Sequence, residues 1–130
     1  MRFEKTSDKE EEVASKIVDA AYAVHKALGP GLSEKIYEVR FCHELTKRGL
    51  SYKKQVDIPI EYDGIKFDEG LRLDVLVEGI IICEIKAVDK GNPVWEAQLL
   101  SYLKLTGKRI GFLLNFNVPV VKNGIKRIIL

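Results

Sequence analysis

Residues 80–88 form an almost continuous apolar run that nevertheless contains a carboxylate and an ammonium group, Glu84 and Lys86. A short run rich in β-branched residues is typical of a strand that is covered on both faces of a sheet. A carboxylate in such a strand is strongly destabilising unless it is paired or binds a metal. The run therefore predicts a buried central strand, and Glu84 needs a chemical explanation.

The preceding apolar run carries a second acid, Asp74, and a second basic residue, Arg72. If the two runs form a hairpin that turns at residues 78–80, every apolar residue of both runs shares one face. In that register Asp74 lies opposite Glu84, and Arg72 lies opposite Lys86. A two-residue turn would instead mix charged and apolar positions, so we favour the first register.

Like charges directly opposite one another destabilise a sheet, but a divalent cation between the two carboxylates would convert the repulsion into a chelate. Hard oxygen donors suit Mg²⁺ or Mn²⁺, whereas zinc sites usually contain Cys or His. The alternative is a buried salt-bridge ladder in which Arg72 and Lys86 neutralise the acids without an ion.

Asp74, followed by Glu84-Ile85-Lys86, resembles the PD-(D/E)XK nuclease signature, in which the acidic pair binds metal and the lysine assists the attacking water. Residues 28–37, Leu-Gly-Pro-Gly-Leu-Ser-Glu-Lys-Ile-Tyr, resemble the GxxExxY motif of a small, mostly prokaryotic family assigned to that superfamily. The resemblance runs from about residue 18 to the C-terminus and includes residues 24–25, 98–103 and 111–116.

This resemblance implies an α/β fold with a restriction-endonuclease-like core, in which helices flank a mixed central sheet. It also implies a Mg²⁺- or Mn²⁺-dependent nuclease that hydrolyses the phosphodiester bonds of nucleic acid, with DNA as the expected substrate. The catalytic candidates are Asp74, Glu84, Lys86 and Gln98. The candidate metal ligands are Asp74, Glu84, the carbonyl of Ile85, and Glu34. Arg72 and Tyr102 are candidates for contact with nucleic acid, and His25 and Tyr37 are further site candidates.

Several of these candidates also have structural interpretations. An acid at the position of Glu34 is favourable near a helix N-terminus, and a cationic ring at His25 suits a helix C-terminus. Gln98 and Tyr102 are four residues apart on one helical face and resemble the QxxxY element of recombination-type exonucleases. Core packing is the alternative for both, and for Tyr37 as well.

The remaining pattern predicts a single domain over residues 1–130. A capping-box pattern at Ser7 and Glu10 predicts a helix that ends before Gly29. Further helices are expected over residues 34–48, capped by Ser33, and 94–106. Strands are expected over residues 54–62, 65–67, 71–77, 80–88, 109–116 and 125–130, with a break at residues 68–70 and a parallel pairing after the last helix. Asp63-Gly64 signals a type I′ turn, and Pro59 indicates an edge strand or a bulge.

Composition excludes few functions, because the net charge is only +2. No apolar run approaches the length of a membrane span, and the first residues do not resemble a signal peptide, so we expect a cytoplasmic protein without membrane contact. Cys42 and Cys83 are expected to be reduced core thiols. Ten basic residues could line a phosphate-binding face or simply be solvated surface: Lys47, Arg48, Lys53, Lys54, Lys104, Lys108, Arg109, Lys122, Lys126 and Arg127.

A second hypothesis is a catalytically inactive module that binds nucleic acid or protein and retains the nuclease fold. The intact acids and Lys86 argue against it, because a retired site has no reason to keep opposed carboxylates on buried strands. The chain has no recognisable specificity domain. As a nuclease, the chain would therefore cut with little sequence preference, act as a homodimer, or depend on a targeting partner.

Overall fold

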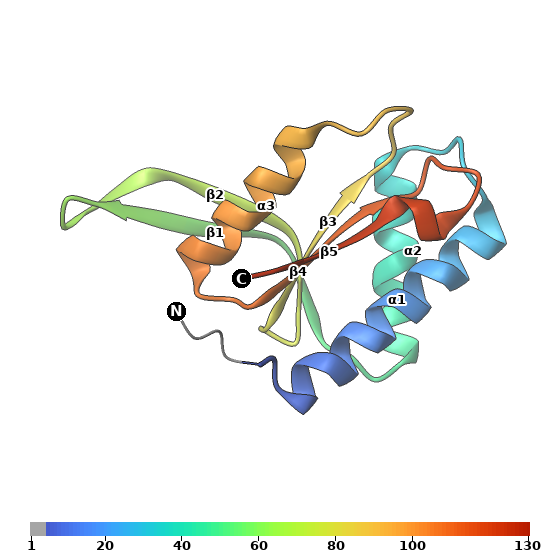
Figure 1. Ribbon diagram of the computed structural model, residues 1–130, viewed down its shortest axis with the longest axis horizontal. Helices are drawn as coiled ribbons and strands as arrows, with labels where there is room; N and C mark the ends of the chain where they lie inside the picture. Colours follow the sequence, from blue (N-terminus) through green and yellow to red (C-terminus); the bar gives the residue numbers. More distant parts are fainter. Residues whose placement is uncertain (1–4) are drawn as a thin grey trace.

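The computed structural model describes residues 5–130, which form one mixed sheet of five strands with helices on both faces (Figure 1). The elements are α1 (Asp8–Leu28), α2 (Glu34–Lys47), β1 (Tyr52–Tyr62), β2 (Ile65–Val77), β3 (Ile81–Lys86), α3 (Pro93–Thr106), β4 (Ile110–Asn115), the 3-10 helix η1 (Val121–Gly124) and β5 (Ile125–Ile129). The strands lie in chain order, and neighbours are antiparallel except for β3 and β4, which α3 joins as a parallel pair. The predicted α/β fold and its parallel pairing are confirmed.

Two hydrophobic clusters lie on opposite faces of the sheet. The larger contains the buried faces of α1 and α2 together with Ile81, Cys83 and Ile85 of β3. The smaller contains Ile82 of β3 and the buried side of α3. Strand β3 is thus covered on both faces, as its apolar run predicts.

The predicted element boundaries are mostly confirmed. Ser7 and Glu10 form the expected capping box, in which each side chain accepts a bond from the other's backbone N–H. Asp63 and Gly64 have φ of +54° and +74°, the signs that a type I′ turn requires. Ser33 occupies the N-cap position of α2, but its side chain makes no capping hydrogen bond, so that part of the prediction is wrong.

The predicted break at residues 68–70 is wrong, because β2 runs through it as one strand of 13 residues. Gly70 pairs with Pro59 of β1, and a Cβ added at Gly70 would lie 2.1 Å from the carbonyl oxygen of Ile58. The glycine therefore permits close approach of two backbones and does not end the strand. Pro59 lies on an edge strand beside a register shift, so both interpretations of that proline are confirmed.

The prediction that every apolar residue of β2 and β3 shares one face is wrong. Leu76 and Ile82 face α3, as alternation along a strand requires, and so does Leu73, which the prediction placed on the side of Val75. Leu73 belongs to the cluster beneath α3, whereas Val75 and Val77 belong to the cluster beneath α1 and α2. Residues two apart in a regular strand face the same side. Strand β2 must therefore turn over between Leu73 and Val75, at Asp74.

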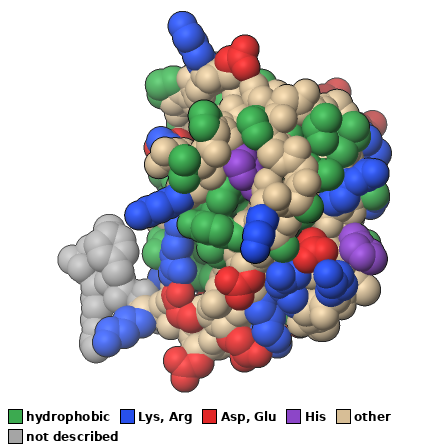
Figure 2. All heavy atoms as spheres, turned by 90° about the vertical axis from the view of Figure 1, so that its right-hand side faces the viewer, with side chains coloured by type: hydrophobic (Ala, Val, Ile, Leu, Met, Phe, Trp, Pro, Cys, Tyr) green, Lys and Arg blue, Asp and Glu red, His purple; other side chains and the backbone are tan. Residues whose placement is uncertain are grey.

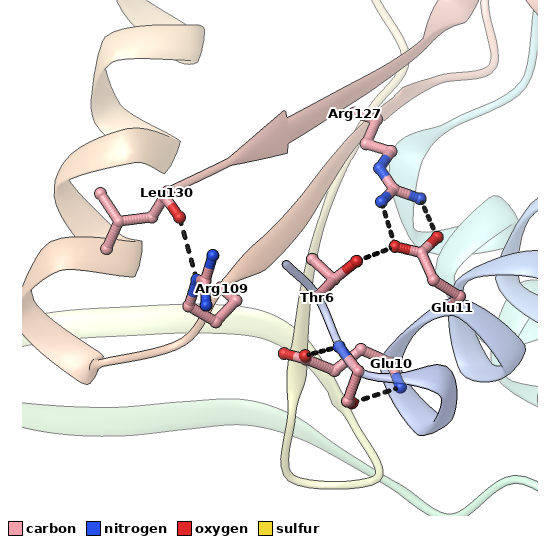
Figure 3. Close-up of polar contacts among 7 residues, drawn as sticks. Thr6, Glu10, Glu11, Arg109, Arg127 and Leu130 are labelled. Carbon is pink, nitrogen blue, oxygen red and sulfur yellow. Dashed lines mark hydrogen bonds and ion pairs between the residues drawn. The ribbon is translucent and has the colours of Figure 1, made fainter. Parts of the chain in front are cut away.

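Within residues 5–130, four of the ten basic residues are seen to pair with acids. Lys47 and Arg48 pair with Glu44, and Lys126 pairs with Glu96. Arg127 donates two hydrogen bonds to Glu11, which joins β5 to α1 and holds the pKa of Glu11 down to about 2 (Figure 3). On the face seen in Figure 2, acidic and basic side chains are interspersed. These pairs favour the interpretation of a mixed, solvated surface over a continuous basic face.

Cys42 and Cys83 are buried and not joined by a disulfide, as predicted. Within residues 5–130, none of the helices combines the length and apolar character that a membrane crossing requires.

Candidate active site

Asp74 and Glu84 lie where the ladder between β2 and β3 ends. The two strands pair from Val77 opposite Ile81 to Val75 opposite Cys83, which is the predicted register. Beyond that pair, side-chain carboxylates replace backbone carbonyls as hydrogen-bond acceptors. Glu84 Oε2 accepts a hydrogen bond from the Asp74 N–H at 3.0 Å, and Asp74 Oδ2 accepts one from the Ile85 N–H at 2.9 Å. Each carboxylate is therefore held by the backbone of the other strand. In Figure 1, β2 and β3 run in different directions away from the centre of the sheet.

The neighbouring strand β1 is also irregular beside Asp74. Gln55 occupies the register position that faces Asp74, and its backbone has φ of +51°. The other described non-glycine residues with positive φ, Asp63 and Glu78, lie at hairpin turns. A left-handed conformation inside a strand costs about 1–2 kcal/mol. Asp74 thus lies between an irregular position in β1 and the end of the ladder with β3, and this site coincides with the change of face after Leu73.

Glu38 links this irregularity to helix α2. Glu38 is only 4% exposed, and its Oε2 accepts a hydrogen bond of 3.1 Å from Gln55 Nε2. Glu38 Oε1 has no hydrogen-bond partner among the described residues, although Lys35 Nζ lies 3.7 Å away. Glu38 is not among the residues predicted for the site. The available signal was its place one helical turn after Glu34, which puts the two acids on one face of α2.

Replacing Gln55 with valine is expected to lower the free energy of unfolding by about 3 kcal/mol. Valine is strained at a positive φ, and it removes the hydrogen bond to the buried Glu38. Gln55→Gly tolerates the backbone conformation and should lose about half as much. Urea denaturation measures both values. Lys53→Val, at an exposed β1 position without positive φ, is the control and should change stability by less than about 0.5 kcal/mol; equal losses at the two positions would contradict the role of Gln55.

Burial and mutual repulsion disfavour the charged forms of the acids. Burial raises the pKa of Glu84 to about 8, and the charge of Asp74 contributes in the same direction. Burial also raises the pKa of Asp74, against a hydrogen bond from Ile85 that lowers it. The pKa of Glu34 is raised by partial burial and by the charge of Asp74. The positive charge of Lys86 lowers the pKa of all three acids, so these four side chains share one electrostatic environment.

Lys86 follows Glu84 by two residues and therefore faces the same side of β3. Its ammonium lies 5.1 Å from the centre of the Trp95 ring, in the range of a cation–π contact. Among residues 5–130, no carboxylate lies within ion-pairing distance of Lys86. Trp95, in the first turn of α3, was also missed, because nothing in the local sequence relates it to Lys86. The ammonium is thus positioned without being neutralised by a bonded acid.

A family model described as the PD-(D/E)XK nuclease superfamily matches residues 11–128. The chain belongs to this superfamily. Its members are generally nucleases, and the match includes Asp74, Glu84 and Lys86. A search of curated proteins and a search of solved structures each found no match. The finer assignment to the GxxExxY family stays a prediction.

Of the other predicted residues, Tyr102 lies close to the PD-(D/E)XK acids. Burial raises its pKa, and the charges of Glu84 and Asp74 raise it further, which places the Tyr102 hydroxyl within electrostatic reach of both. Gln98 lies one turn earlier on α3 and is exposed to solvent. Helix α3 therefore brings Tyr102 near the acids, whereas the catalytic role of Gln98 stays a prediction.

The structure places two predicted residues, Arg72 and His25, in contacts outside the acidic pair. Arg72 Nε donates to Asp57 on β1 at 3.0 Å, so its guanidinium pairs with that acid and not with Asp74 or Glu84. His25 Nε2 lies 2.7 Å from the carbonyl oxygen of Val118 and so links α1 to the segment before η1. These contacts give Arg72 and His25 structural partners.

Tyr37 is fully buried, and its ring stacks on Phe116 with centroids 4.8 Å apart. Its hydroxyl donates to the Gly29 carbonyl at 2.6 Å and accepts a bond of 3.1 Å from the Leu32 N–H. Both polar contacts close the turn between α1 and α2. Tyr37 is therefore a packing residue that sets the position of α2, and with it Glu34 and Glu38.

The donor set of this PD-(D/E)XK site can be tested against a divalent cation. Asp74 Oδ1 and Glu84 Oε1 accept no hydrogen bond from the described residues, so each acid keeps one free hard oxygen donor. No group of three or more His, Cys, Asp and Glu side chains within residues 5–130 is arranged to hold a metal. What fits is a set of two carboxylates completed by a backbone carbonyl and water, which is the way Mg²⁺ is commonly held.

Proposed function

We propose that the protein is a Mg²⁺- or Mn²⁺-dependent nuclease that hydrolyses phosphodiester bonds of DNA. The observation that carries the proposal is the reciprocal pair of backbone hydrogen bonds that holds Asp74 and Glu84 together, with Lys86 on the same side. A purely structural salt-bridge ladder would leave Lys86 bonded to one of the acids, and Arg72 to the other. Instead, Lys86 lies against Trp95 and Arg72 pairs with Asp57.

In this proposal Asp74, Glu84 and the carbonyl of Ile85 hold the ion, and Glu34 contributes directly or through water. The bound ion supplies a water of lowered pKa and neutralises charge on the phosphate. The N–H groups of Asp74 and Ile85 fix the carboxylates in advance, so they need no rearrangement during the reaction. Lys86 holds the attacking water or stabilises the negative charge that develops on the phosphate.

The substrate-binding side of the proposal uses helix α3 and strand β2. Gln98 and Tyr102 are proposed to order the site or the nucleic acid strand, as their resemblance to the QxxxY element suggests. Arg72 can contact phosphate if its pair with Asp57 opens. His25 and Tyr37 support the site through the contacts described above. The GxxExxY motif, whose glutamate is Glu34, is proposed to assign the chain to that family.

The experiment that tests this function combines calorimetry with cleavage assays. Wild-type protein is titrated with Mn²⁺ and incubated with plasmid DNA in Mg²⁺, Mn²⁺ or a chelator. We expect a binding isotherm that Asp74→Ala abolishes, and cleavage only when the metal is present. Asp57→Ala, which removes an acid from β1, is the control and should keep both. Nucleic-acid binding that ignores the metal and Asp74→Ala, without cleavage, would establish the inactive module instead.

A further inference from the structure

The far ends of β1 and β2 form a two-stranded arm, residues 57–70, that extends away from the body of the molecule past α3 (Figure 1). Every residue from 61 to 70 is exposed. An isolated two-stranded ribbon is only marginally stable in water unless something packs against it. The arm is therefore a surface that can gain stability from a partner.

One face of the arm is apolar. Tyr62 and Ile65 lie directly opposite each other in the ladder, and Phe67 follows Ile65 by two residues, so all three point to the same side. Their exposed fractions are 75%, 55% and 44%. The next pair in the ladder, Glu61 and Lys66, lies on the opposite face. The arm is an amphipathic ribbon whose apolar face has no cover within the described chain.

The charge of the arm favours a basic protein partner over nucleic acid. Residues 57–70 contain five acids and one lysine, a formal charge of −4. Because the whole chain carries +2, the remainder carries +6. A ribbon with this negative charge is repelled by phosphate. The rest of a second copy of the same chain offers the opposite charge.

A groove that can receive the arm of a second copy lies at the base of the arm. A groove with a volume of about 510 Å³ runs between β1, β2 and the end of α3. Its apolar lining includes Ile60, Leu76 and Leu105, the last being 53% exposed. Lys108 contributes positive charge, whereas the charges of Glu61 and Lys66, which belong to the arm, cancel. An apolar, acidic ribbon and an apolar groove that carries the lysine Lys108 are complementary. Because both surfaces occur on one chain, two copies can satisfy each other by two-fold symmetry.

We propose that the arm of one copy docks its apolar face, Tyr62, Ile65 and Phe67, into this groove of a second copy, which gives a dimer with exchanged arms. The proposal goes beyond the nuclease function and does not depend on it, because none of these residues belongs to the acidic site. The arms tie the two active sites into one assembly.

Sedimentation velocity tests this dimer directly. Wild-type protein is expected to sediment as a dimer at tens of micromolar, and rising salt should weaken the association. Tyr62→Ser, Phe67→Ser and, on the groove side, Leu105→Ser should each raise the dissociation constant about tenfold or more. Val94→Ser and Val120→Ser change exposed apolar residues elsewhere and should leave it unaltered. All five side chains are exposed, so circular dichroism should show intact folding.

A wild-type protein that stays monomeric at several hundred micromolar would overturn the proposal. The proposal would also fail if the dissociation constant of the dimer changed no more in the arm and groove variants than in the two control variants. The interface would then lie elsewhere. A dimer weakened from both the arm and the groove supports it, whether or not the protein cleaves DNA.

Discussion

Lys86→Met is expected to lower the rate of DNA hydrolysis by about a thousandfold while the protein still folds and binds Mn²⁺. Methionine keeps an unbranched apolar side chain against Trp95 but removes the ammonium. No acid loses a bonded partner, since no described carboxylate is within ion-pairing distance of Lys86. The affinity for Mn²⁺ should not fall, because Lys86 is not a ligand and its positive charge repels a cation. Single-turnover cleavage and calorimetry measure the two quantities separately.

The matched control is Lys104→Met, which makes the same change at an exposed position on α3 and should leave the rate within about twofold of wild type. Lys86→Arg keeps the charge but spreads it over a planar group, so it should recover only part of the lost rate. A Lys86→Met protein that cleaves within about tenfold of the wild-type rate would remove the lysine from the mechanism. The acids and their metal would then have to account for the activity alone.

The central hairpin was predictable because several independent constraints agree on it. Alternation of apolar residues fixes the register, and the turn at residues 78–80 fits only that register, so the pairing of Val75 with Cys83 follows from the sequence. The juxtaposition of Asp74 and Glu84 follows from the same register. The register does not predict that the ladder ends after Val75 and Cys83, where side-chain carboxylates replace backbone acceptors.

Gln55 and Glu38 could not be predicted, because their roles depend on contacts between distant segments. Gln55 lies 17 residues from Glu38 in the chain, and only the folded packing of β1 beside α2 brings them together. A positive φ within a strand has no local sequence signal when the residue is glutamine. The same irregular region accounts for the error at Leu73, since strict alternation cannot anticipate a strand that turns over.

In the absence of metal, the protein is expected to lose stability as the pH rises from about 5 to about 8. The pKa of Glu84 is near 4.5 in the unfolded chain and about 8 in the folded one. Between these values the folded protein retains a proton that the unfolded chain has released, so raising the pH favours unfolding. Each pKa unit corresponds to about 1.4 kcal/mol, so the loss is on the order of 4 kcal/mol. The raised pKa values of Asp74 and Glu34 act in the same direction. Urea denaturation in a chelator at pH 5.5 and 8.5 measures it.

Glu84→Gln should remove most of this dependence, because glutamine keeps an oxygen that can accept the Asp74 N–H but carries no proton to lose. The variant should match wild type near pH 5 and exceed it by several kcal/mol above pH 8. Adding Mn²⁺ should reverse the order, since only the wild type gains binding energy from the ion. Glu44→Gln is the control. The ion pair with Arg48 lowers the pKa of Glu44, so this acid stays ionised between the two pH values, and the substitution should leave the change in stability between them unaltered. Equal stability of the wild-type protein at both pH values without metal would contradict this. It would show that groups within the fold already balance the negative charges of the two acids, so that no cation is needed between them.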